Sequence, residues 1–293
     1  APSPDGQHLA FTIMGDVYVK ELPDGEPEHI ASMDAMAAQP SWSPDGERLV
    51  FASYSDAEGG QMYVVDPDGD DLERITTEAA FYTQPVFSPD GERVVAIRGP
   101  RIAYEEALTQ GVPRGSVDLV WVPSSGGAAS LITPVAGLNA PHFVQGSDRI
   151  HATQAGAGLV SMRWDGTDRR EHVQVRGASQ GGGQGPAASM IRMAPEGDQA
   201  MALVGNQLYV VTVPYGVGAE APTISVANPA SAAFPTEQLT DIGAQFPAWG
   251  ASGREVHWAL GNAHFVYDLD AAQAFADSVD AARAAEDGEE EAE

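Results

Sequence analysis

The sequence has 293 residues, 43% of them hydrophobic, with 32 glycines, 21 prolines and no cysteine. Its 42 acidic residues outnumber its 15 basic residues and give a net charge of -27, which repels nucleic acid and anionic membrane surfaces. The lack of cysteine excludes disulfides and thiolate metal sites, and no apolar run reaches the roughly 18 residues of a membrane helix. Residues 1–20 also lack the basic-then-apolar order of a signal peptide.

One tetrapeptide, Ser-Pro-Asp-Gly, recurs along the chain and organises it. It occurs at residues 3–6, 43–46 and 88–91, with a close variant at 194–197 and degenerate copies at 144–147 and 250–253. The six starts lie 40 to 56 residues apart, which is the length of one four-stranded propeller blade with variable loops. Proline fixes φ at the first corner, aspartate accepts hydrogen bonds from the following amides, and glycine adopts the positive φ that closes a turn. The tetrapeptide therefore predicts a hairpin between the innermost strand of a blade and the next strand.

The second unit shows the predicted order of strands most clearly. Its innermost strand, 39–42, leads into the turn, and strands at 48–52, 62–65 and 73–76 follow. The other units repeat this order. The sequence therefore predicts an all-β fold: a six-bladed β-propeller over residues 1–270, with units that start near 3, 43, 88, 144, 194 and 250. A β-sandwich is the alternative architecture.

The two ends of the chain are predicted to differ from the repeats. The first unit begins at its turn and lacks an innermost strand, and the sixth, 245–267, lacks an outermost one. Because open sheet edges invite aggregation, we expect a segment upstream of residue 1 to supply both strands and close the ring. Residues 271–286 are alanine-rich with apolar residues at helical spacing, and residues 286–293 contain six acids. We expect a short helix that runs into a flexible acidic linker, 271–293 in all.

Patterns that would indicate catalysis or a bound ion are weak. The seven histidines are scattered and no two are one residue apart, so the chain lacks the His-x-His pair of hydrolase metal sites. The acidic run 66–71 has its glycine fourth rather than sixth, which favours a hairpin turn over a calcium loop. No Gly-x-Ser-x-Gly elbow occurs, and the glycine-rich residues 177–185 indicate a flexible connection between blades four and five. We predict no catalytic residue, no metal ligand and no cofactor within the chain.

The segment 99–116 is the best candidate for a functional surface. It interrupts the third unit between its second and third strands, on the propeller face opposite the Ser-Pro-Asp-Gly turns, where inserted loops often dock partners. The candidate contact residues are Arg98, Arg101, Tyr104, Glu105 and Arg114. We expect them to contact a partner domain or a substrate path. A surface loop without such a role is the alternative.

The repeats resemble those of TolB-like β-propellers, which TolB shares with tricorn-type proteases and the propeller halves of several secreted hydrolases. Four longer stretches, 101–108, 141–143, 159–170 and 206–211, resemble more narrowly the amino-terminal propeller of large bacterial amidohydrolase-family proteins. The resemblance covers essentially the whole chain. It implies an exported protein, periplasmic or secreted, in which a metal-dependent barrel follows the acidic segment, with zinc as the expected divalent metal.

The resemblance leaves three functions open. The first is a non-catalytic propeller module that gates or positions substrate and docks a metal-dependent hydrolase domain. The second is a stand-alone periplasmic scaffold that binds proteins, similar to TolB. The third is the propeller of a serine peptidase. The expected partner is therefore a downstream catalytic domain or another protein, with no nucleic acid and no membrane insertion.

Overall fold

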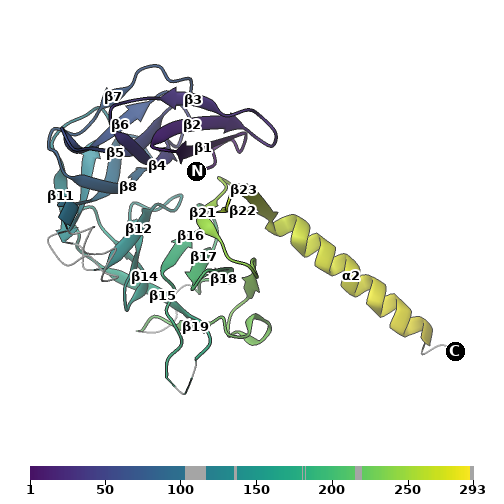
Figure 1. Cartoon of the computed structure of the whole chain (residues 1–293). Helices are drawn as coiled ribbons and strands as arrows, with labels where there is room; N and C mark the ends of the chain where they lie inside the picture. The colour runs from purple at the N-terminus through teal and green to yellow at the C-terminus, as the bar shows by residue number, and fades with distance from the viewer. Residues whose placement is uncertain (103–116, 135–136, 180, 182, 215–219, 291–293) are drawn as a thin grey trace.

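The computed structural model describes residues 1–102, 117–134, 137–179, 181, 183–214 and 220–290. In these residues six β-sheets follow one another along the chain and surround a common axis (Figure 1). Each sheet is one blade, and neighbouring strands within a blade are antiparallel except for one added strand in blade 4. The predicted six-bladed β-propeller is confirmed.

The blades differ in their number of strands. Blade 1 consists of β1 (His8–Ile13), β2 (Asp16–Glu21) and β3 (Glu28–Ala31). Blade 2 consists of β4 (Met36–Trp42), β5 (Leu49–Ser55), β6 (Gly59–Val65) and β7 (Glu73–Arg74). Blade 3 consists of β8 (Phe81–Phe87), β9 (Arg93–Gly99), β10 (Asp118–Pro123) and β11 (Ser130–Pro134).

The second half of the ring follows the same order. Blade 4 consists of β12 (Leu138–His142), β13 (Ile150–Gln154), β14 (Gly158–Met162), β15 (Arg170–Arg176) and β19 (Thr223–Ser225). Blade 5 consists of β16 (Met190–Met193), β17 (Gln199–Val204), β18 (Gln207–Thr212) and β20 (Thr236–Gln238), with a 3-10 turn η1 (Pro229–Ser231) before β20. Blade 6 consists of β21 (Gln245–Trp249), β22 (Glu255–Leu260) and β23 (Ala263–Asp268).

The Ser-Pro-Asp-Gly turns form the predicted hairpins, with the predicted chemistry. In blade 2 the Ser43 hydroxyl donates a 2.5 Å hydrogen bond to the Asp45 carboxylate, which also accepts from the Glu47 amide at 3.1 Å. Gly46 closes the turn with φ of 76°, a left-handed conformation that a side chain would strain. The turns at 3–6 and 88–91 repeat the same bonds.

The hydrophobic core lies between neighbouring blades. In blade 2, Leu49 and Phe51 pack against blade 1, whereas Val50 and Val64 face the other way and pack against blade 3. Five such clusters fill the interfaces from blades 1 and 2 to blades 5 and 6. A fully buried side chain of this size contributes about 1.5–3 kcal/mol, so the alternation of strand residues holds each blade to both of its neighbours.

Blade 4 has a strand that the repeats do not predict. The connection from β18 to β20 leaves blade 5 and crosses to blade 4, where β19 pairs in parallel with β15. Buried Ile224 of β19 packs in the cluster between blades 4 and 5. The glycine-rich segment before blade 5 is held at its base, because the Gly177 amide donates a 2.9 Å hydrogen bond to the Pro186 carbonyl.

The first blade corrects one expectation. Residues 1–3 run beside β1, where Pro2 bridges Leu9 and the Ala10 amide donates a 2.8 Å hydrogen bond to the Ala1 carbonyl. Blade 1 therefore has part of an innermost strand before its turn, formed by residues too few to show a strand pattern in the sequence. Among the described residues, blade 6 has no fourth strand beyond β23. The upstream closing segment stays a prediction.

The C-terminal helix is longer than predicted. Helix α2 (Leu269–Glu290) begins two residues before the expected start and continues through residues 286–290, which were expected in a flexible linker. The Asp268 carboxylate caps its start by accepting from the amides of Asp270 and Ala271, both at 2.9 Å. From this cap the helix projects away from the ring (Figure 1).

Candidate functional site

The face opposite the Ser-Pro-Asp-Gly turns carries the segment predicted as a functional surface, and we call it the insertion face. Arg98, at the end of β9, donates to the carboxylates of Glu78 at 3.3 Å and Asp118 at 3.2 Å. These bonds join the two strands at the base of the inserted segment to the preceding connection. Arg98 therefore has a structural role at this face.

Arg101 contacts the neighbouring blade 2. Its guanidinium carbon lies 4.6 Å from the centre of the Tyr54 ring, and its Nη1 donates to the Tyr54 hydroxyl at 2.5 Å and to Asp56 at 2.9 Å. Such a cation–π contact is worth about 0.5–1 kcal/mol at an exposed site. The other predicted contact residues, Tyr104, Glu105 and Arg114, lie outside the described residues.

An apolar strip continues from Tyr54 toward blade 1. Met36 lies opposite Tyr54 in the pairing of β4 with β5. The hairpin between β1 and β2 lies next to Met36, because the Ala37 amide donates a 2.7 Å hydrogen bond to the Gly15 carbonyl. We define the insertion-face strip as Ile13, Met14, Met36, Tyr54 and Arg101. Sequence reasoning identified only Arg101 of these five residues.

The strip exposes apolar side chains that folding would be expected to bury. Met14 is 96% exposed, Met36 69% and Ile13 47%. Met14 also has φ of 55°, and with Gly15 at 96° it forms a hairpin turn of type I′, in which asparagine or aspartate is usual at the first position. A methionine in this conformation is strained, and an exposed strained residue often marks a functional surface.

Carboxylates surround the strip. Asp34, Asp56, Glu58 and Glu78 lie in the connections of blades 1 to 3 on the insertion face, and all four are exposed. Arg101 neutralises Asp56 locally, and Arg98 does the same for Glu78. The surface is thus apolar in the middle and acidic at its margin.

The innermost strands carry a ladder of glutamine bonds near the axis. The Gln39 side-chain oxygen accepts a 2.6 Å hydrogen bond from the Gln84 amide, and the Gln84 side-chain oxygen accepts one of 2.6 Å from the Ala140 amide. These three residues precede prolines at β-bulges of β4, β8 and β12, and each has positive φ. The ladder therefore has a structural role, since it satisfies amides that the bulges leave without a strand partner.

The fold brings together histidines that the sequence leaves scattered. His142, His151 and His172 form a row in blade 4, with ring centres 5.7 and 5.6 Å apart. His142 accepts from the Met193 amide at 3.0 Å, and burial holds the pKa of His142 well below its usual 6.5. Burial likewise lowers the pKa of His151 to about 4. The row is therefore neutral at pH 7.

A second histidine pair lies in blade 6. Nδ1 of His257 lies 3.2 Å from Nε2 of His264, and burial is the main cause that lowers the pKa of each to about 4. Within the described part of the chain, no group of three or more metal-ligating side chains could hold an ion. Both histidine clusters therefore supply ring contacts and hydrogen bonds in this structure, with tilted rings in blade 4 and stacked rings in blade 6.

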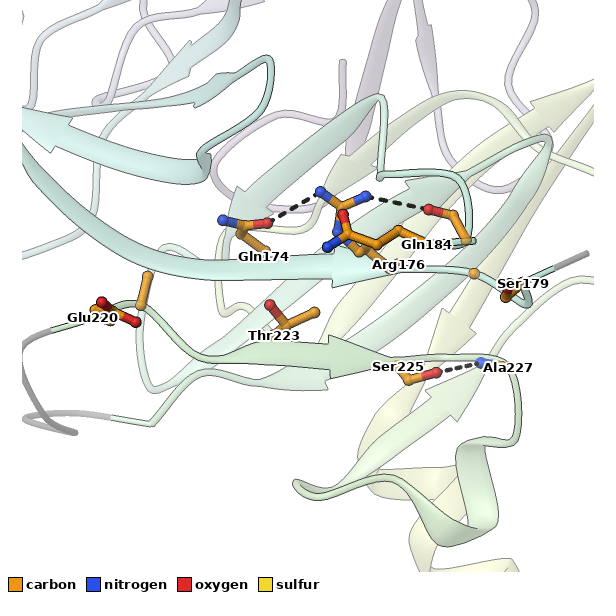
Figure 2. Close-up of a pocket in the computed structure, with 11 residues that line it drawn as sticks. Gln174, Arg176, Ser179, Gln184, Glu220, Thr223, Ser225 and Ala227 are labelled. Carbon is orange, nitrogen blue, oxygen red and sulfur yellow. Dashed lines mark hydrogen bonds between the residues drawn. The ribbon is translucent and has the colours of Figure 1, made fainter. Parts of the chain in front are cut away.

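A polar cavity of about 660 Å³ lies at the outer edge of blade 4 (Figure 2). The top of β15, the loop after Gly177 and the added strand β19 form its walls. Arg176 donates to the Gly185 carbonyl at 3.2 Å and to the Gln174 side chain at 3.3 Å, and Glu220 lies at the other end of the cavity.

The cavity lacks a pair of groups for nucleophilic catalysis. The hydroxyl of Ser179 donates to the Gly183 carbonyl, and that of Ser225 accepts from the Ala227 amide at 3.4 Å. Neither hydroxyl has a basic partner among the described residues, as a nucleophile would require. Sequence reasoning missed this cavity because β19 comes from the next blade.

Comparisons with known proteins agree with this architecture. A family model described as the TolB beta propeller domain matches residues 1–105. TolB from Acinetobacter baumannii superposes with a TM-score of 0.62 at 12% identity, covering 92% of this chain and 63% of that chain. The chain thus spans less than two thirds of that protein. A comparison with curated protein sequences gave no match.

Two enzymes share the fold at similarly low identity. A gluconolactonase from Xanthomonas campestris superposes with a TM-score of 0.60 at 13% identity, covering 90% of this chain and 83% of that chain. An oligogalacturonate lyase from Vibrio parahaemolyticus gives 0.57 at 14% identity, covering 92% and 74%. Among the described residues, no helix is long and apolar enough to span a membrane. The chain is therefore a six-bladed β-propeller, and its residues 1–105 match the TolB beta propeller domain.

Proposed function

We propose that the chain is a non-catalytic propeller module that docks a protein domain through the insertion-face strip. The observation that carries this proposal is Met14, which is strained and 96% exposed at the tip of a hairpin. Neither property stabilises the folded chain, so both are explained best by a partner that covers the side chain. Methionine suits such a contact because its flexible, polarizable side chain adapts to the surface that it meets.

The margin of the strip indicates the chemistry of the partner. An apolar surface bordered by Asp34, Glu58 and Glu78 complements a partner that presents apolar side chains flanked by lysine or arginine. The net charge of -27 increases the rate at which such a basic surface approaches and makes that rate depend on ionic strength.

The resemblance of the longer stretches to amidohydrolase-associated propellers favours a particular partner. We infer that it is a metal-dependent hydrolase domain of the same exported protein, with zinc held by that domain and not by the propeller. A stand-alone periplasmic scaffold is the second candidate, supported by the fold shared with TolB. The propeller of a serine peptidase is the third. In each of them we expect the catalytic residues to lie outside the described part of the propeller.

The encoded sequence that follows residue 293 distinguishes these candidates. A strand with His-x-His supports the hydrolase domain, a Gly-x-Ser-x-Gly elbow supports the peptidase, and a stop codon supports the scaffold.

The docking surface is tested on the natural full-length protein with the double variant Met14→Asn and Met36→Gln. We expect the affinity between propeller and partner domain to fall at least tenfold, while Leu131→Gln, at an exposed apolar residue of the outer strand β11, leaves it unchanged. Equal affinity in all three proteins would contradict docking at this strip.

A further inference from the structure

The six innermost strands contribute one residue each to a layer around the propeller axis, which we call the axial layer. It consists of the residues two positions before each turn: Ala1, Ser41, Val86, His142, Arg192 and Ala248. Trp42 and Trp249, which follow this position in blades 2 and 6, donate indole hydrogen bonds to the carbonyls of Ala1 and Arg192 in the preceding blades, at 3.0 and 2.9 Å. These matching bonds show that Ala1 and Arg192 occupy equivalent places in their blades.

Arg192 is the fixed positive charge of the axial layer. Its neighbours in β16, Ile191 and Met193, are buried against blade 4, so the alternation of strand residues directs Arg192 toward blade 6 at the innermost strand. The residue is partly exposed, yet its Nε is fully buried and has no hydrogen-bond partner. Of the residues that the structure describes, none forms an ion pair or a side-chain hydrogen bond with Arg192.

The charge of Arg192 acts on its neighbour in blade 4. Repulsion by His151 and Arg192 adds to burial in holding the pKa of His142 well below 6.5. His142 is therefore neutral at pH 7, whereas a guanidinium stays protonated in proteins.

Several other arginines of the chain lie beside a carboxylate. Carboxylates are abundant, and Arg98, Arg101, Arg149 and Arg254 each have one within 3.3 Å. A buried N–H donor without an acceptor, such as Nε of Arg192, destabilises the fold, because its lost hydration is not replaced. The free guanidinium at the axis is therefore explained best by a ligand that supplies the missing negative charge.

We propose that Arg192 binds the carboxylate of a monoanionic ligand at the propeller axis. The planar fork of a guanidinium matches the two oxygens of a carboxylate. The field of a chain with net charge -27 repels a dianion such as phosphate more strongly than a monoanion, so carboxylate is favoured. Ser41, Val86 and Ala248 carry no charge that would compete for the guanidinium. The ligand is either a free small carboxylate or the C-terminal carboxylate of a peptide.

Thermal unfolding with added anions tests the site. Wild type, Arg192→Met and the control Arg169→Met are heated at constant ionic strength with sodium acetate, N-acetylglycine, N-acetylglycinamide or sodium phosphate. Arg169 is an exposed arginine with no ion pair among the described residues. We expect both carboxylates, but not the neutral amide, to raise the Tm of wild type and of Arg169→Met. Arg192→Met should begin with a higher Tm, because it removes a charged group whose Nε–H is buried without an acceptor, and should show no response to anions. Stronger stabilisation by acetate supports a free ligand, and by N-acetylglycine a peptide terminus.

A second measurement does not depend on the variant folding. In wild type labelled with ¹⁵N-arginine, the Nε–H resonance of Arg192 should shift as acetate or N-acetylglycine is added, and an added tenfold excess of N-acetylglycinamide should not reproduce the shift. An unchanged Arg192 resonance, an equal Tm response in Arg192→Met, or a larger response of wild type to phosphate than to carboxylate would each overturn the proposal.

Discussion

The indole N–H of Trp249 donates a 2.9 Å hydrogen bond to the backbone carbonyl of Arg192, one blade earlier in the chain. Trp42 makes the equivalent bond to Ala1 at 3.0 Å. Both tryptophans stand directly before a turn of the repeat, so the repeated sequence also specifies polar bonds that join one innermost strand to the preceding one. The propeller is therefore held at its axis by bonds of known position, which can be removed one at a time.

Replacing Trp249 by phenylalanine should lower the free energy of unfolding by about 1–3 kcal/mol. The change leaves a carbonyl without its donor and also removes part of a side chain that is 9% exposed in the interface of blades 5 and 6. Urea unfolding followed by circular dichroism measures the loss. An unchanged midpoint would mean that the indole bond does not contribute to the interface.

Replacing Met14 by asparagine should raise the free energy of unfolding by roughly 0.5–1 kcal/mol. Asparagine tolerates the left-handed conformation that Met14 holds at φ of 55°, and the change removes an exposed apolar side chain without loss of a buried contact. The same urea titration measures the gain. A loss of stability would show that Met14 belongs to the packing of the fold, and would remove the main support for a docking role.

Replacing Gln84 by alanine should cost about 1 kcal/mol of stability, because the Ala140 amide loses the side-chain oxygen that accepts from it at 2.6 Å. Gln39→Ala is the matched control. It removes the side-chain oxygen that accepts from the Gln84 amide. Because this hydrogen bond is exposed, water can hydrate the Gln84 amide in the variant. A cost for Gln39→Ala equal to or greater than that for Gln84→Ala would contradict this account of the ladder.

The buried histidines should make the fold less stable as the pH falls below about 6.5. The folded pKa of His151 and of His257 is about 4, whereas an unfolded histidine titrates near 6.5, so the unfolded chain binds more protons between these values. Each histidine can contribute up to about 1.4 kcal/mol per pH unit in this window. Urea titrations at pH 7.5, 6.0 and 5.0 measure the slope, and His151→Gln should reduce it. Equal stability at all three values would show that these histidines are not held neutral by the fold.

The fold follows from the sequence because its information is local and repeated. A turn such as 43–46 needs only four consecutive residues, and six copies at blade spacing leave few architectures open. The strand β19 was not predicted from the sequence, because its pairing with β15 joins residues about fifty positions apart and no local pattern specifies this pairing. The length of α2 was underestimated because the acidic composition of residues 286–290 was taken as a sign of disorder.

The candidate site was predicted only in part. Arg101 was identified because it starts an insertion, which is visible as a break in the repeat. The hairpin of Met14 lies next to Met36 through a hydrogen bond between blades 1 and 2, and the exposure of both methionines is a property of the folded surface. A signal for Met14 was present, because Met-Gly stands where a two-residue hairpin favours Asn-Gly. Arg192 carried a comparable signal, as a charged residue within an otherwise apolar innermost strand.

Site-specific photo-crosslinking tests the docking surface most directly. A photoreactive phenylalanine analogue is placed at Met14, and at Leu131 as the control, in the protein expressed in its natural host, and the crosslinked peptides are identified by mass spectrometry. Docking through the insertion-face strip predicts one dominant crosslink from position 14 to a folded protein domain, and no crosslink to that domain from position 131. We expect this domain to be a His-x-His barrel. Crosslinks from Met14 that are absent, or that match those from Leu131 in identity and yield, would contradict the account.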